Sequence, residues 1–133
     1  NMTTQTKQLD FEKRKQRALQ RLGSANPYCI ICGESDWRCL ELHHIGQEDF
    51  DASTSIVCRN CHRKASDAQM THPKPLNLTE PAMLERIGHV LLGLADFFEL
   101  LIEKLRSFGH YLIEVAYQYI SIKQTNSTPA EEN

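Results

Sequence analysis

Four cysteines, arranged as two Cys-x-x-Cys pairs, are the residues of this 133-residue chain best suited to chemistry. Cys29 and Cys32 form the first pair, and Cys58 and Cys61 form the second. Each pair places two thiolates on one tight turn, and two such turns supply the tetrahedral sulfur set that zinc prefers. The 33–57 gap between the pairs is a little longer than is usual for such sites. The pattern predicts one structural zinc ion, with two disulfides or a redox pair as the alternative.

The cysteine count and the beginning of the chain bear on the compartment. Cys39 is a fifth cysteine outside the two pairs, and an odd number with this spacing favours a reducing cytosol over an extracellular disulfide framework. Cys39 itself is expected to be a small buried or half-buried residue. The first 25 residues are polar and charged, without an apolar signal segment, so we expect a cytoplasmic location.

Three histidines accompany the two pairs. His43 and His44 lie between the pairs, and His62 directly follows Cys61. A zinc ion that is saturated by four cysteines has no open position, so these imidazoles are available for another role. The alternative is that all three are ordinary polar or packed side chains.

The histidines lie within two short motifs, Leu42-His43-His44-Ile45 and Val57-Cys58-Arg59-Asn60-Cys61-His62. Over residues 25–68 the chain resembles the HNH nucleases, in the branch whose ββα-metal unit is braced by a four-cysteine zinc. The resemblance implies a β-hairpin, a loop and a helix that hold one catalytic divalent ion (Mg, Mn, Ni or Zn) beside a nucleic-acid phosphate. By position, it implies that His44 is the general base and that His43 and His62 bind the ion.

One position departs from the motif of that family. Ser53 stands where a middle Asn is expected, and that Asn normally holds the general base through a hydrogen bond. A serine hydroxyl can also form such a bond, but its reach is shorter. The residues of the 46–55 loop, which include Glu48, Asp49 and Asp51, are acidic for a site beside a phosphate. Both features favour the alternative of a catalytically impaired zinc-containing nucleic-acid-binding or adaptor module.

The charge is unevenly distributed along the chain. The formal net charge is −2, yet the first 75 residues carry 11 basic and 9 acidic side chains, and the remainder carry 4 and 8. The basic character therefore belongs to the zinc part, as expected for a nucleic-acid partner, and the resemblance to the HNH nucleases implies that this partner is DNA. The basic side chains predicted to contact phosphates are Arg59, Arg63, Lys64, Lys13, Arg14 and Arg17.

Beyond a proline-containing linker, apolar residues recur at alternating intervals of three and four, which is the pattern of a coiled-coil seam. The seam residues are Leu84, Ile87, Leu91, Leu94, Phe98, Leu101, Leu105, Phe108, Leu112, Val115, Tyr119 and Ile122. This pattern predicts a helix over 81–123 that assembles at least a homodimer. A hairpin that folds back near Gly109 and a peripheral membrane contact are alternatives, whereas Asp96 and Glu99 interrupt any membrane span. His89 and His110 lie off the seam and are expected to face solvent.

The expected fold class is a small α+β, zinc-braced ββα-metal domain, treble-clef-like, followed by a long coiled-coil-like helix, mainly α by residue count. Local signals predict a helix from Phe11 to about Leu22 capped by Asp10, a strand over Trp37–Leu42, and a helix from Cys58 to about Met70. The predicted segments are a basic helix within 1–24 after an irregular start, the zinc domain 25–70, a linker 71–80, the oligomerisation helix 81–123 and a disordered tail 124–133.

Overall fold

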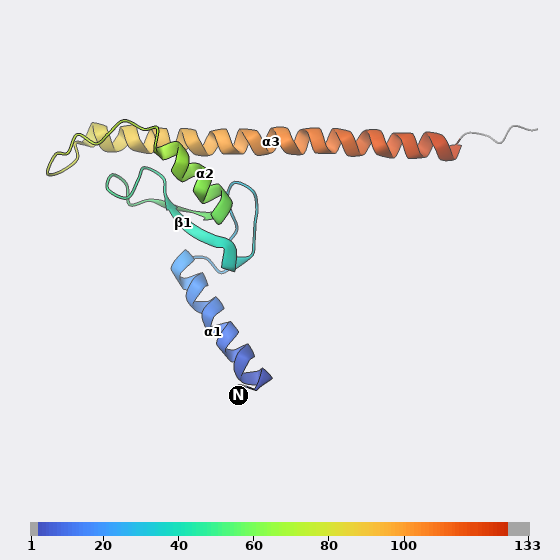
Figure 1. Ribbon diagram of the computed structural model, residues 1–133, viewed down its shortest axis with the longest axis horizontal. Coiled ribbons are helices and arrows are strands. Elements are labelled where there is room, and N and C mark those ends of the chain that lie inside the picture. Colours follow the sequence, from blue (N-terminus) through green and yellow to red (C-terminus); the bar gives the residue numbers. More distant parts are fainter. Residues whose placement is uncertain (1–2, 128–133) are drawn as a thin grey trace, which may run out of the picture. The chain divides into compact units, whose positions relative to one another are not determined.

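The computed structural model describes residues 3–127, which are mostly helical and include one small antiparallel sheet (Figure 1). The elements in chain order are α1 (Thr4–Leu22), the 3-10 turn η1 (Trp37–Cys39), β1 (Leu40–His44), β2 (Thr54–Cys58), α2 (Arg59–Gln69) and α3 (Met83–Ser127). The chain divides into two compact units, one ending at Leu101 and the other beginning at Ile102. The predicted strand pair, the helix that follows it and the long C-terminal helix are all present.

The hairpin and α2 position the second cysteine pair, with Cys58 at the end of β2 and Cys61 in α2. β1 and β2 pair in antiparallel register from Leu40 opposite Cys58 to His44 opposite Thr54. β2 continues directly into α2, because Cys58 ends the strand and also caps the helix, with its Sγ accepting a hydrogen bond from the Cys61 amide at 3.4 Å. Cys58 thereby joins the strand to the helix and contributes its sulfur to the group of four cysteines.

α1 begins earlier than the sequence pattern predicts. Thr3 is the N-cap, and its side chain accepts a hydrogen bond from the Thr6 amide at 3.2 Å. Asp10 consequently lies inside the helix and does not cap it, and the predicted irregular start is wrong from Thr4 onward. The helix ends as predicted at Gly23, whose φ of 73° is a left-handed conformation that glycine adopts without strain.

The predicted strand over Trp37–Leu42 is wrong in its first half. The Asp36 carboxylate accepts a hydrogen bond from the Arg38 amide at 3.0 Å and pairs with the Arg38 guanidinium at 2.8 Å. These contacts close a 3-10 turn, so the strand begins only at Leu40. Cys39, expected to be buried or half-buried, is exposed at the end of this turn.

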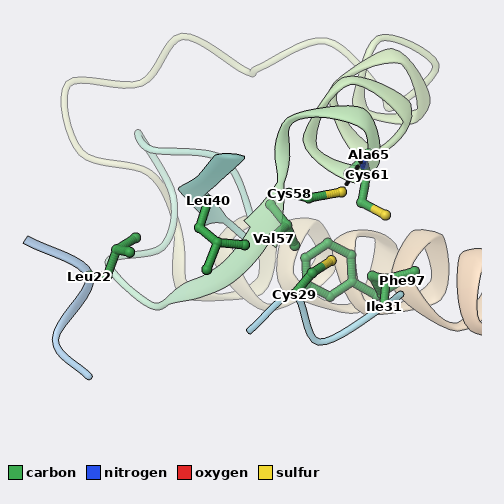
Figure 2. Close-up of a cluster of buried hydrophobic side chains, with 9 residues drawn as sticks. All are labelled: Leu22, Cys29, Ile31, Leu40, Val57, Cys58, Cys61, Ala65 and Phe97. Carbon is green, nitrogen blue, oxygen red and sulfur yellow. Dashed lines mark hydrogen bonds between the residues drawn. The ribbon is translucent and has the colours of Figure 1, made fainter. Parts of the chain in front are cut away.

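The core is a single cluster in which three of the paired cysteines pack together with apolar side chains (Figure 2). Its members are Leu22, Cys29, Ile31, Leu40, Val57, Cys58, Cys61, Ala65 and Phe97. Every element of the first unit except η1 contributes at least one of these residues, together with the segment that carries the first cysteine pair. A metal ion bound by these cysteines would stabilise so small a core.

The N-terminal part of α3, up to Leu101, belongs to the first compact unit, which contains the four paired cysteines. Gly93 packs against the backbone of Ile45, so closely that a Cβ at position 93 would overlap the Ile45 carbonyl. Phe97 lies in the core, and His89 is 5% exposed and stacks on the Phe50 ring at 4.0 Å between centroids. The prediction of an exposed His89 is wrong, because this flank of α3 faces the hairpin loop. For the same reason the compact unit does not end at the predicted 71–80 linker.

The second unit contains the remainder of α3, which continues through Gly109 without a break, so the predicted hairpin alternative is wrong. His110 is exposed, as predicted. Helix α3 reaches Ser127, which shortens the predicted 124–133 tail, and residues 128–133 lie outside the described part of the chain. Among residues 3–127, no helix is long and apolar enough to cross a membrane.

Candidate metal centre

The four paired cysteines come together in one cluster. Cys29, Cys32, Cys58 and Cys61 place their sulfur atoms within 4.8 Å of one another, and Cys32 Sγ lies 3.6 Å from Cys58 Sγ. Tetrahedral zinc with Zn–S bonds of about 2.3 Å requires sulfur separations of roughly 3.8 Å. All five cysteines are free thiols, so the disulfide alternative is not adopted. The donor set and its spacing fit a structural metal such as zinc.

Local backbone geometry builds each half of the cluster. Gly33 adopts φ of 80°, and its amide donates to the Cys29 carbonyl at 2.9 Å, which closes the first turn. The second turn is the N-terminus of α2, where unpaired amides and the helix dipole favour a negatively charged sulfur. Both turns therefore present sulfur atoms next to backbone donors.

The electrostatics of the thiols also favour a cation. Burial raises the pKa of Cys29, but hydrogen bonds from the backbone amides of Cys32, Cys58 and Ile31 outweigh it and lower that pKa to about 7. Burial raises the pKa of Cys32 and of Cys61, and neighbouring cysteines add to the increase at both. Four thiolates at this separation repel one another, and a divalent cation removes that repulsion.

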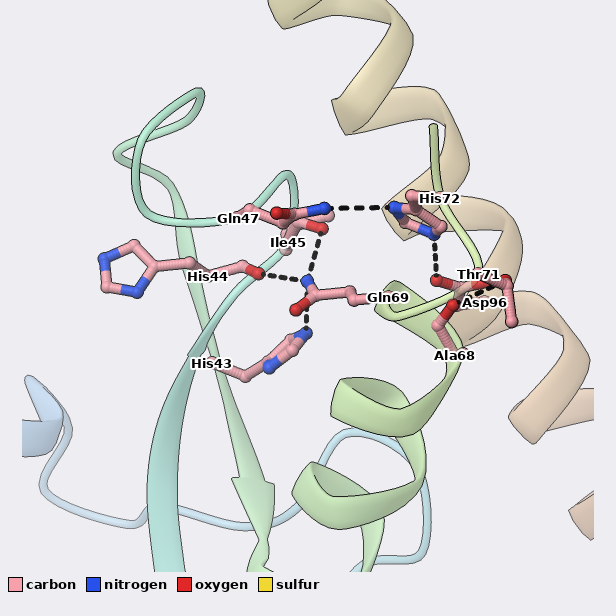
Figure 3. Close-up of polar contacts among 9 residues, drawn as sticks. All are labelled: His43, His44, Ile45, Gln47, Ala68, Gln69, Thr71, His72 and Asp96. Atoms are coloured by element: carbon pink, nitrogen blue, oxygen red, sulfur yellow. Dashed lines mark hydrogen bonds and ion pairs between the residues drawn. The ribbon is translucent and has the colours of Figure 1, made fainter. Parts of the chain in front are cut away.

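His43 lies between the hairpin and α2. It is 3% exposed, and its Nε2 accepts a hydrogen bond from Gln69 Nε2 at 3.2 Å (Figure 3). The ring of Phe97 in α3 lies 5.3 Å away between centroids. Burial lowers the pKa of the His43 imidazole to about 4, and the neighbouring His62 and His44 act in the same direction. His43 is therefore neutral near pH 7, the state that metal ligation requires.

His62 lies on the first turn of α2, and its ring forms a short hydrogen bond with Glu41 of β1. Its Nδ1 donates to Glu41 Oε2 at 2.6 Å, and Glu41 Oε1 also accepts from Arg59 Nε at 3.3 Å. Because Nδ1 donates to Glu41, Nε2 is the ring nitrogen that a metal ion could bind. Metal-ligating histidines commonly donate their second nitrogen to a carboxylate in this way.

The two histidines predicted to bind a catalytic ion are neighbours. The rings of His43 and His62 lie 5.0 Å apart between centroids, one from β1 and one from α2. Two imidazoles suit zinc or nickel and leave further positions for water and phosphate. Across residues 3–127, the four cysteines are the only group of three or more ligand atoms this close, so the pair would form an open site.

His44, the predicted general base, leaves β1 on the face opposite to His43, as Figure 3 shows. Its side chain makes no hydrogen bond within residues 3–127 and is half-buried. Ser53, predicted to hold this base, instead donates its hydroxyl to Asp51. That bond, ahead of other contributions, lowers the pKa of the Asp51 carboxyl, to which the charge of His44 also contributes. The structure thus brings His43 and His62 together and separates them from His44 and Ser53.

The predicted phosphate-contacting side chains are placed on two helices. Lys13, Arg14 and Arg17 are exposed on α1. On α2, Arg59 pairs with Glu41, and Arg63 lies 3.8 Å from Asp67. Lys64 is exposed on the same helix. The α2 arginines therefore have acidic partners that a phosphate would have to replace.

Sequence reasoning missed three residues that shape the histidine site. Glu41 orients His62, Gln69 holds His43, and Phe97 covers His43. Glu41 was detectable, since it lies two residues before His43 and strand alternation puts both on one face. Gln69 and Phe97 depend on how α2 and α3 pack, and no local pattern encodes that.

Comparisons with protein-family models, with curated proteins and with solved structures find no match for this chain.

Proposed function

We propose that the protein is a metal-dependent endonuclease of the HNH type, which hydrolyses phosphodiester bonds in nucleic acid, with DNA the expected substrate. The observation that carries this proposal is the geometry of His62, whose Nδ1 is 2.6 Å from Glu41 Oε2 while its ring lies 5.0 Å from that of His43. Two imidazoles, one on a hairpin and one on the helix that follows it, are a suitable scaffold for one divalent ion.

The proposed roles of the residues follow from their places. His62 and His43 hold the ion, and Gln69 releases Nε2 of His43 when the ion binds. A divalent ion there supplies charge stabilisation to the scissile phosphate and the leaving oxygen. His44, the neighbour of His43 at the end of β1, takes a proton from the attacking water.

A second candidate function is favoured by specific observations. His43 is buried beneath Phe97, and His44 lies on the other face of β1. A zinc-braced module that binds nucleic acid without cleaving it needs neither histidine to reach a phosphate. In that case the His43 ring packs against Phe97, and His62 stabilises the surface through its bond to Glu41, which also pairs with Arg59.

Cleavage of supercoiled plasmid separates the two functions. The zinc-loaded protein is incubated with Mg²⁺, Mn²⁺ or Ni²⁺, with EDTA as the metal-free control. We expect nicking that falls about 100-fold or more in His44→Ala and in His62→Ala, in line with the loss of a general base or a metal ligand. His110→Ala, an exposed histidine on α3, is the matched control and should cleave like the parent. An inactive parent with all three metals contradicts the nuclease proposal and favours the binding module.

We further propose that α3 assembles the chain into at least a homodimer. In the unit beginning at Ile102 the seam residues are exposed, with Leu105 at 69% and Leu112 at 64%. Burial of each such side chain is favourable by roughly 1.5–3 kcal/mol, so a second copy of the same stripe is the natural partner. Assembly would bring two zinc domains to one nucleic acid.

A further inference from the structure

Tyr28 presents an aromatic ring to solvent from a fixed position. The side chain is 59% exposed, although both neighbours in the chain, Pro27 and Cys29, are buried. The Cys29 amide donates to the Glu34 carbonyl at 2.8 Å, and the Ile30 amide donates to the Ile56 carbonyl at 3.1 Å. The backbone beside Tyr28 is therefore anchored to the zinc turn and to β2, while its ring remains accessible.

Tyr28 lies between two hollows, each of about 360 Å³. The first is bounded by α1 and η1 and the second by the end of α1 and the hairpin, and both are lined by Asn26, Pro27 and Tyr28. A volume of this size is at the lower end of the range for small-molecule sites and suits a single heterocycle in each hollow.

The lining of the first hollow has the chemistry of a nucleotide site. Trp37 adds a second aromatic ring, Asn26 offers an amide that can donate and accept, and Lys15 offers an ammonium group. Lys15 is half-buried, whereas the other five basic residues of α1 are exposed. A base that is not paired stacks on aromatic rings, bonds through its edge to an amide and brings its phosphate to a cation.

The second hollow is lined by the strand partner of the candidate general base, His44. It is lined by Leu42, Thr54 and Ile56, among others. Leu42 pairs with Ile56 and His44 pairs with Thr54, and directly paired residues of an antiparallel hairpin share a face of the sheet. Leu42, Thr54 and Ile56 of the second hollow therefore share one face of the hairpin with His44, the face away from His43, and the first hollow adjoins the second at Asn26, Pro27 and Tyr28.

From this juxtaposition we propose that Tyr28 is the stacking platform of a site for unpaired nucleobases, one in each hollow. A single strand bound there continues over the hairpin face towards His44. The inference deepens the proposed function, on which it rests for the identity of the partner as nucleic acid. It names single-stranded or locally unpaired nucleic acid as the substrate class.

Binding of four labelled 12-mers to the zinc-loaded full chain, without added divalent metal, tests the site. The probes are fluorescein-labelled (dT)12 and (rU)12, an abasic 12-mer with the same phosphates, and a blunt 12-base-pair duplex. We expect (dT)12 to bind roughly 5- to 150-fold tighter than the abasic strand for each base stacked. Trp37 is the single tryptophan of the chain, so its fluorescence should be quenched by (dT)12 and not by the abasic strand.

Tyr28→Leu keeps an apolar side chain but removes the ring, and Tyr117→Leu, at an exposed tyrosine of α3, is the matched control. The first variant should bind (dT)12 no better than the abasic strand, whereas the second should retain the parent preference. Tighter binding of (rU)12 than of (dT)12 would support the site and identify RNA as its preferred ligand. Equal binding of (dT)12 and the abasic strand, or an unchanged preference in Tyr28→Leu, would overturn the proposal. Because no step requires cleavage, loss of the nuclease proposal and loss of this site are separate results.

Discussion

The four paired cysteines are the residues whose arrangement the sequence predicts most completely. Their spacing predicts one metal site, and all four sulfur atoms lie within 4.8 Å. We expect one zinc ion per chain, measured by elemental analysis after purification without chelator. Zinc binding supplies folding free energy to a small domain, so Cys61→Ser should lose the ion and the cooperative unfolding of the zinc domain.

The fifth cysteine gives this test an internal control. Cys39 is exposed and outside the cluster, so Cys39→Ser should keep the same zinc content and unfolding midpoint as the parent. A folded parent without zinc would disprove the structural-metal assignment. Equal zinc in Cys61→Ser and the parent would remove Cys61 from the ligand set.

The histidines show how far residue types alone can be interpreted. The resemblance to the HNH nucleases implied that His43 and His62 are neighbours, and their rings are 5.0 Å apart. Spacing did not predict the depth of His43, because its burial depends on Phe97, more than fifty residues later in the chain. It likewise could not show that the Ser53 hydroxyl is already bound to Asp51, since that depends on the path of the loop.

At the scale of elements, one glycine sets how closely α3 approaches the hairpin. A Cβ at Gly93 would overlap the Ile45 carbonyl, whereas a Cβ at Gly88 of the same helix meets nothing within 4 Å. Gly93→Ala should therefore destabilise the zinc domain by about 1–3 kcal/mol, the usual cost of overpacking. Gly88→Ala should instead stabilise it by up to about 1 kcal/mol, because alanine has the higher helix propensity.

Urea unfolding of the zinc-loaded variants measures both effects. If Gly93→Ala and Gly88→Ala shift the free energy of unfolding in the same direction, the close contact between α3 and Ile45 is not part of the folded state in solution. Opposite shifts would support it and show that α3 is a structural part of the zinc domain.

The elements themselves were predictable where a local signal dominates. Gly23 stops α1 and the seam pattern gives α3, both as observed. The failures occurred where a side chain competes with the regular pattern. The Asp36 carboxylate turns the chain at Arg38, and Thr3 starts α1 before Asp10 can. His89 was misplaced because helix periodicity identifies a flank but not what that flank contacts.

At the scale of the whole molecule, the exposed seam of α3 predicts self-association. Leu105 and Leu112 lie in the unit after Leu101, so changing them leaves the core of the zinc domain intact. The parent should have at least the mass of a dimer by light scattering at micromolar concentration. Leu105→Glu with Leu112→Glu should reduce that mass, because two buried like charges oppose association.

Two serines outside the seam provide the matched charge control. Ser107→Glu with Ser121→Glu adds the same charge to exposed positions of α3 and should keep the parent mass. A parent with the mass of a single chain would rule out assembly at that concentration. An oligomer that survives the leucine substitutions would place the interface elsewhere.

The central claim is that the chain has a second metal site, formed by His43 and His62, beside the cysteine cluster. Calorimetric titration of the zinc-loaded protein with Ni²⁺ tests it directly, since nickel favours imidazole ligands. We predict binding of one Ni²⁺ per chain with the zinc content unchanged, lost in His62→Ala and retained in the exposed-histidine control His110→Ala. Absence of Ni²⁺ binding to the parent, or equal binding to His62→Ala, would contradict the claim.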